Sequence, residues 1–125
     1  MYQIKDNIKL LCQKYNSTGC EITEYDLNDW PTPWPYCGCA GVYIVVNVHN
    51  EVIYVGEAAE LGRRLSDHFV GDAENRVICK DGWKNPSCII VVKMPDDRKA
   101  FRKTLEEELI NIYWPTGKLY NVKNN

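Results

Sequence analysis

The sequence predicts an α+β domain, because helical and strand patterns alternate along one short chain. Apolar residues recur at helical spacing near both ends, and between them lie a hairpin-like segment and a β-branched run of strand length. A length of 125 residues suits one domain with its own core. We therefore expect a single α/β (α+β) domain of short strands flanked by helices.

Residues 1–39 are expected to form an N-terminal, mainly helical extension packed on a domain of residues 40–125. Apolar residues recur every three to four positions from Ile4 to Tyr15, which predicts an amphipathic helix over residues 3–15. The segment CEITEYDL alternates loosely and could be a short strand. In NDWPTPWPYCGC, three prolines in five residues deny a ladder its backbone donors, which predicts a loop. Its two tryptophans either pin the loop to the domain or offer a contact surface.

The segment GVYIVVNVHNEVIYVG (41–56) is predicted to be a β-hairpin with a two-residue turn at His49 and Asn50. This register puts Val45 opposite Tyr54 and Tyr43 opposite Gly56. One face is then wholly apolar and must be buried, and it carries Val42, Ile44, Val46, Ile53 and Val55. The other face, not needed for the core, carries Tyr43, Val45, Asn47, Val52, Tyr54 and Gly56.

On that second face the two tyrosines would be diagonal neighbours, about 7 to 8 Å apart at their Cα atoms. Gly56 would leave an open space in front of Tyr43. A three-residue turn would shift the register by one and separate the tyrosines. Alternatively, both tyrosines are there only because aromatic residues suit strands.

Helix, strand and helix follow the hairpin. AAELGRRLSDHFV (58–70) has apolar residues four apart up to Phe69, and Gly71 could end this helix. NRVICKDGWKNP has turn chemistry but no clear periodicity. SCIIVVKM (87–94) predicts a buried third strand. Asp96 could cap a last helix that Pro115 ends, with an apolar stripe of Phe101, Leu105, Leu109, Ile112 and Tyr113.

Charged side chains lie at helical spacing in both predicted helices. Arg64 and His68 are four apart and project from one face, although they could be a solvated flank, with Arg64 paired to Glu60. In LEEEL, Glu106 and Glu108 border the apolar stripe on opposite sides, and periodicity does not choose between them. An exposed glutamate run is the simpler interpretation.

Composition excludes several other classes. No segment approaches the roughly 20 apolar residues of a membrane helix, and Asp6 interrupts the N-terminal segment, so we expect no membrane association and a cytoplasmic location. The net charge of −2 does not steer nucleic acid, which would need a local basic patch. Six cysteines are expected to be free thiols, the alternative being a zinc site at Cys37 and Cys39 with His49 or His68.

Together these residues resemble the GIY-YIG nuclease superfamily. GVY (41–43) and YVG (54–56) look like the two halves of its signature, and Arg64, His68, Glu106 and Asn121 match the remaining positions in order and spacing. Val42 and Val55 replace isoleucine conservatively. Glu57 departs from the family pattern by adding a negative charge beside the second motif, and residues 1–39 lie outside the resemblance.

The resemblance implies a small three-stranded antiparallel sheet flanked by helices, and a DNA endonuclease. It implies that Glu106 ligates Mg²⁺ (or Mn²⁺), that Arg64 binds the scissile phosphate, and that Tyr43 deprotonates or orients the water. Tyr54 and His68 would position phosphate or relay a proton. Gly56 would give clearance to the phosphate, and Asn121 would anchor the tail against the site.

The alternative is a catalytically inactive module that binds nucleic acid or a protein partner. The net negative charge of the chain, the extra acidic residue Glu57 and the two tryptophans of WPTPW favour it. Only residues 1–39 lie outside the predicted domain, which points to an enzyme of low or structure-directed specificity, to recruitment by a protein partner, or to a homo-oligomer.

Overall fold

The computed structural model describes residues 2–29, 38–71 and 77–122. The segment with Trp30 and Trp34 and the thiol of Cys37 therefore lie outside the described residues. In chain order the elements are α1 (Tyr2–Lys14), β1 (Glu21–Asp26), η1 (Leu27–Asp29), β2 (Gly41–Asn47), β3 (Val52–Ala58), α2 (Leu61–His68), β4 (Phe69–Gly71), β5 (Val77–Cys79), β6 (Pro86–Lys93), α3 (Lys99–Tyr113) and η2 (Trp114–Thr116).

The main sheet is antiparallel and has four strands in the order β1-β6-β2-β3. The predicted strands β2, β3 and β6 are confirmed, with β6 at the centre beside β2. The fourth strand, β1, comes from the N-terminal segment and pairs with β6 over its whole length, from Glu21 opposite Lys93 to Asp26 opposite Cys88. Residues 21–26 are therefore part of the same sheet as the hairpin.

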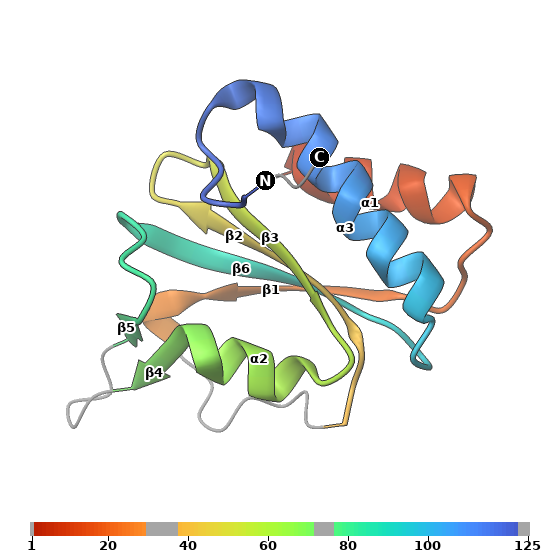
Figure 1. Cartoon of the computed structure of the whole chain (residues 1–125), viewed down its shortest axis with the longest axis horizontal. Helices are drawn as coiled ribbons and strands as arrows, with labels where there is room; N and C mark the ends of the chain where they lie inside the picture. Colours follow the sequence, from red (N-terminus) through yellow and green to blue (C-terminus); the bar gives the residue numbers. More distant parts are fainter. Residues whose placement is uncertain (1, 30–37, 72–76, 123–125) are drawn as a thin grey trace.

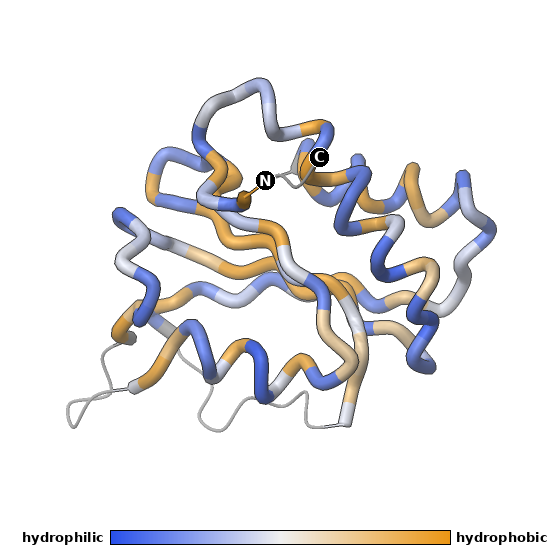
Figure 2. Tube along the Cα trace, viewed as in Figure 1, coloured by the Kyte–Doolittle hydropathy of each residue, from blue (hydrophilic) through white to orange (hydrophobic). Residues whose placement is uncertain are grey.

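Helices cover both faces of this sheet (Figure 1). Helices α1 and α3 lie over one face, and α2 with the small β4-β5 sheet lies over the other. The strands between them are the most apolar part of the chain (Figure 2). One core, around Ile8, Ile44 and Leu105, fills the α1–α3 side, and a second core, around Tyr43, Leu65 and Phe69, fills the α2 side. The expectation that the tyrosine face is not needed for the core is therefore wrong.

The hairpin turn has three residues, not the two predicted. The Asn47 amide donates to the Glu51 carbonyl at 2.9 Å, which leaves Val48, His49 and Asn50 in the turn. Asn50 adopts a left-handed φ of 59°, and the Asn47 side chain accepts the His49 and Glu51 amides. Asparagine tolerates both roles well, so these residues favour this longer turn.

A β-bulge restores the predicted register. Val46 pairs with Val52, but Val45 pairs with Tyr54, so Ile53 is an extra residue in β3. Tyr43 accordingly lies opposite Gly56, as predicted. The bulge also exchanges two side chains: Val52 joins the α1–α3 core and Ile53 joins the α2 core, the reverse of the prediction. The predicted loss of the tyrosine pair with a three-residue turn is wrong because the bulge compensates for the shift.

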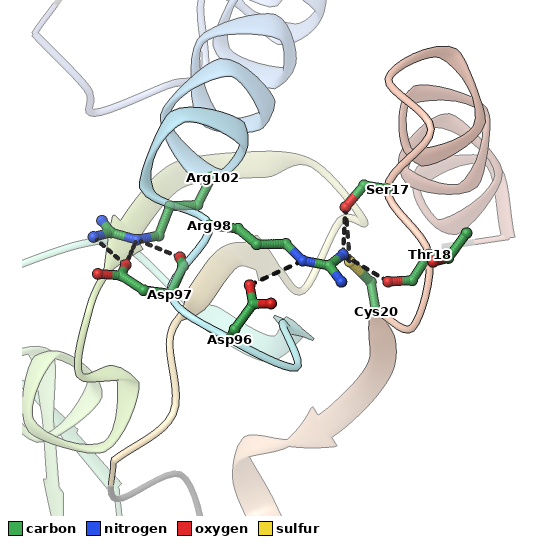
Figure 3. Close-up of polar contacts among 7 residues, drawn as sticks. All are labelled: Ser17, Thr18, Cys20, Asp96, Asp97, Arg98 and Arg102. Atoms are coloured by element: carbon green, nitrogen blue, oxygen red, sulfur yellow. Dashed lines mark hydrogen bonds and ion pairs between the residues drawn. The ribbon is translucent and has the colours of Figure 1, made fainter.

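Contacts of the Arg98 side chain, and not a cap from Asp96, fix the start of α3. Arg98 is the N-cap residue, with a left-handed φ of 41° and no capping side chain. Its guanidinium donates to Ser17 Oγ at 2.7 Å, to the Thr18 carbonyl at 2.6 Å and to Asp96 Oδ1 at 3.0 Å (Figure 3). These bonds join α3 to the segment between α1 and β1.

Helix α2 ends one residue earlier than its apolar pattern implies, at His68, and Phe69 begins β4. No helix in the described residues is long and apolar enough to cross a membrane. The described cysteines (12, 20, 39, 79 and 88) are thiols. Among the described residues no group of three or more His, Cys, Asp or Glu could hold a metal ion, so the zinc alternative finds no support there.

Candidate active site

Tyr43 and Tyr54 lie side by side on the α2 face of the hairpin. Their ring centroids are 6.1 Å apart with an interplanar angle of 28°. Tyr43 is fully buried, whereas Tyr54 is half-buried and reaches the surface. Because Tyr43 lies opposite Gly56, its ring occupies the space where a Cβ of Gly56 would be. The open space expected in front of Tyr43 is thus filled by the tyrosine itself, and contact of Gly56 with a substrate stays a prediction.

His68 connects Tyr43 to an acidic residue that the sequence did not indicate. The Tyr43 hydroxyl lies 2.7 Å from His68 Nε2, and His68 Nδ1 lies 2.7 Å from Asp81 Oδ2. The His68 side chain is 11% exposed and that of Asp81 33% exposed. Tyrosine, imidazole and carboxylate therefore form one hydrogen-bonded line that runs from the core toward the surface.

Trp83 covers this line. Its ring stacks on Tyr54 at 4.7 Å between centroids and lies 4.9 Å from the His68 ring, and the residue is only 8% exposed. A tryptophan flanked by polar turn residues in KDGWKN is a sequence signal that the loop packs inward, since exposure of so large an apolar ring is costly. Periodicity could not reveal it, because the segment is too short and irregular.

Arg64 and Glu106 approach the tyrosines from two different helices. The Arg64 side chain is exposed on α2, and its positive charge lowers the pKa of Tyr43. Glu106, half-buried on α3, lies near Glu57 at the end of β3, and its charge acts on both Tyr43 and Tyr54. Arginine and carboxylate thus border the tyrosine pair.

The structure distinguishes Glu106 from Glu108. Glu108 Oε1 accepts a hydrogen bond from Tyr15 at 2.8 Å and lies 3.7 Å from Lys14, so it faces α1. Glu107 is exposed, as predicted. The charge of Glu106 acts on both tyrosines, whereas Glu108 is bound by Tyr15 and Lys14; the role of Glu106 as a metal ligand stays a prediction.

Burial perturbs the titrating groups of the site. It raises the pKa of Tyr43 far above the ordinary tyrosine value; the Tyr54 and Glu106 charges raise this pKa further, and Arg64 opposes them. Burial and Glu106 likewise raise the pKa of Tyr54. The pKa of the Glu106 carboxyl is raised by burial and by the nearby Glu57 charge, while the hydrogen bond from the Glu57 backbone lowers it. Tyr43 is therefore a hydroxyl at neutral pH and needs a proton acceptor to act as a base.

Glu57 does not carry an uncompensated charge, although the sequence suggested one beside the site. Its carboxylate forms an ion pair with Arg102, which is 5% exposed and also binds Asp97 Oδ1 at 2.7 Å. Arginine offers a planar set of donors that can serve both carboxylates at once. Arg102 gave no sequence signal, because it lies one helical turn before Glu106 and reads as an ordinary charged helix residue.

Asn121 holds the C-terminal segment on the outer edge of β3. Its Oδ1 accepts from the Val55 amide at 2.9 Å, and its Nδ2 donates to the Val55 carbonyl at 2.7 Å. The Tyr120 amide also donates to the Ile53 carbonyl at 2.7 Å. The tail therefore covers an edge that would otherwise expose unpaired backbone groups. Asn121 anchors the strand that carries Tyr54, and contact with a substrate stays a prediction.

A surface cavity of about 300 Å³ opens beside Glu106. It is lined by Glu57, Lys103, Glu106, Glu107, Ile110, Asn111 and Val122. One carboxylate facing such a space suits Mg²⁺, which binds few protein ligands and keeps several waters. The donor set around Glu106 thus fits a hydrated divalent cation better than a fully coordinated structural metal.

Comparisons with known proteins identify the family of this chain. A family model described as the GIY-YIG catalytic domain matches residues 39–121. UvrABC system protein C of Rickettsia canadensis is 36% identical over 63 residues, which are 50% of this chain and 9% of that protein. The same protein of Chlamydia abortus is 33% identical over 82 residues, which are 66% of this chain and 13% of that protein. The chain thus spans only a small part of the length of these relatives. The search of solved structures found no match. With the family model covering most of the chain and the motif residues gathered at one site, this chain belongs to the GIY-YIG family.

Proposed function

We propose that the chain is a metal-dependent endonuclease that hydrolyses DNA phosphodiester bonds. The observation that supports it most is the Tyr43–His68 hydrogen bond, bordered by Arg64 and Glu106. Phosphodiester hydrolysis needs a group that takes a proton from water and positive charge near the phosphate. These side chains supply both functions within one site.

Each residue has a role that its surroundings favour. Tyr43 orients the attacking water and takes its proton while its own hydroxyl proton moves to His68 Nε2, so that no free phenolate has to accumulate. Tyr54, at the surface, contacts the phosphate or its sugar. Arg64 pairs with the scissile phosphate, for which a guanidinium is well suited.

Glu106 would hold Mg²⁺ or Mn²⁺. A bound divalent cation supplies positive charge that stabilises the phosphate oxygens as charge develops on them. Gly56 contributes indirectly, because the absence of its side chain lets Tyr43 reach His68.

The alternative, an inactive binding module, loses part of its support. Glu57 was one of its motives, but Arg102 neutralises this carboxylate. Residues 1–29 do not form an independent DNA-binding segment, because Ile4 and Ile8 are buried in the core and β1 is part of the sheet. A protein partner or a second copy of the chain could help to target the site.

The test is nicking of supercoiled plasmid DNA with Mg²⁺ or Mn²⁺. Replacing Glu106 with glutamine should reduce the nicking rate at least about 10²-fold, the scale of a lost charge interaction at a catalytic site. Asp67→Asn, an exposed acid on α2 that does not line the cavity beside Glu106, should cleave like the wild type. Full activity of Glu106→Gln would refute the site, and tight DNA binding without cleavage by the wild type would favour the binding module.

A further inference from the structure

The line Tyr43–His68–Asp81 has a direction that follows from hydrogen-bond chemistry. A carboxylate can only accept, so the 2.7 Å contact of Asp81 Oδ2 with His68 Nδ1 places a proton on Nδ1. In the neutral imidazole Nε2 is then the acceptor, and it lies 2.7 Å from the Tyr43 hydroxyl. The opposite tautomer would place two acceptors face to face, at Nδ1 and at the Asp81 carboxylate.

The segment that carries Asp81 is held at both ends. The Lys80 amide donates to the His68 carbonyl at 2.8 Å, next to the pairing of Phe69 with Cys79. Lys80 therefore binds the backbone of His68, and Asp81 binds its side chain. Two residues further on, Trp83 packs against the His68 ring. This arrangement allows the imidazole little freedom to rotate.

We propose that Asp81 is a positioning residue for the hydrolytic reaction: it fixes the tautomer and ring orientation of His68 so that Nε2 can receive the Tyr43 proton. This inference rests on the proposed nuclease function. As the water gives a proton to the Tyr43 oxygen, the Tyr43 hydroxyl proton passes to Nε2, and the imidazolium faces the Asp81 carboxylate. When the phosphodiester bond breaks, the leaving sugar oxygen takes a proton from solvent, and His68 then releases its own proton to solvent, which restores the site.

A purely structural role for Asp81 makes a different prediction. Ion pairs with a partner as exposed as Asp81 contribute little to stability. If the contact were only such a surface pair, its loss would leave the tautomer of His68 and the turnover number unchanged. Positioning instead predicts that both change while the fold persists.

The tautomer is measured by ¹⁵N NMR of the imidazole in the metal-free chain. The sequence has two histidines, so a His49→Gln variant assigns the signals. The wild type should carry its proton on Nδ1. In Asp81→Asn the amide can donate to Nδ1, so the proton should move to Nε2, kcat for plasmid nicking should fall about 10²-fold or more, and KM should be unchanged. Asp81→Glu, which keeps an acceptor, should retain the wild-type tautomer and recover part of kcat.

Asp67→Asn, an exposed acid on α2, is the matched control and should behave like the wild type. A wild-type proton on Nε2, or an Asp81→Asn variant with unchanged tautomer and kcat, would overturn the proposal. If Asp81→Asn fails to fold, the His68 tautomer of the wild type and the tautomer and kcat of Asp81→Glu test the proposal instead. If the wild type cleaves no DNA, the proposed function fails, whereas the tautomer measurement still decides whether Asp81 orients His68.

Discussion

Replacing Gly56 with alanine should displace the Tyr43 ring, because the added methyl group would overlap the far end of that ring at its Cζ and hydroxyl. Tyr43 is fully buried and has no free space into which to move. The ring or strand β3 must therefore shift, and a shift of the ring separates the hydroxyl from His68.

The expected cost has two parts. Overpacking a well-filled core costs about 1–3 kcal/mol. Loss of the buried Tyr43–His68 hydrogen bond leaves polar groups unsatisfied and adds about 1–3 kcal/mol. Gly56→Ala should therefore lower the free energy of unfolding by about 2–6 kcal/mol and reduce nicking to the level of a Tyr43 variant.

Urea unfolding measures this cost, and a double-mutant cycle identifies its cause. In a Tyr43→Leu background the clashing atoms are absent, so the same Gly56→Ala change should cost less than about 1 kcal/mol. Gly117→Ala, where the added Cβ meets nothing within 4 Å but φ is 72°, reports the cost of backbone strain alone. Equal costs of Gly56→Ala in the wild-type and Tyr43→Leu backgrounds would refute the explanation.

Two further predictions concern buried groups. Burial raises the pKa of Tyr43, so above about pH 10 the unfolded chain loses this proton while the folded chain keeps it; the free energy of unfolding then falls by about 1.4 kcal/mol per pH unit from this residue. Tyr43→Phe should remove that slope between about pH 10 and 11 in urea unfolding, and unchanged slopes would contradict the burial argument. Replacing Arg102 with methionine should cost about 3–5 kcal/mol, because it leaves Glu57 charged and buried without its partner. Adding Glu57→Gln should recover part of this loss, and no recovery would show that the ion pair is not the cause.

Local patterns predicted most elements and the tyrosine pair. The helical repeats of α1, α2 and α3 and the β-branched run of β6 depend on residues close in sequence, and each element formed near its predicted bounds. The register of Tyr43 against Gly56 was also correct, although the turn was wrong. The bulge at Ile53 was missed, because its compensation of the turn depends on both faces of the hairpin being packed against helices.

Contacts between residues far apart in the chain could not be predicted from the sequence. The choice of Glu106 over Glu108 depends on the end of α1, because Lys14 and the following residue, Tyr15, both contact Glu108. Helical geometry alone places the two acids symmetrically about the apolar stripe, so it could not make that choice. The compensation of Glu57 by Arg102 likewise joins residues on different elements.

By itself, then, the sequence determined most of the elements and the motif spacing, since these follow from backbone periods of two and 3.6 residues. The face shared by the two tyrosines also needed the bulge at Ile53, which compensates for the longer turn. Only the tertiary structure decided what surrounds them: it placed the Tyr43 ring over Gly56, brought Asp81 and Trp83 to His68 from an irregular segment, and paired Glu57 with Arg102. Such contacts depend on how helices and loops pack across the sheet, and no local period encodes that packing.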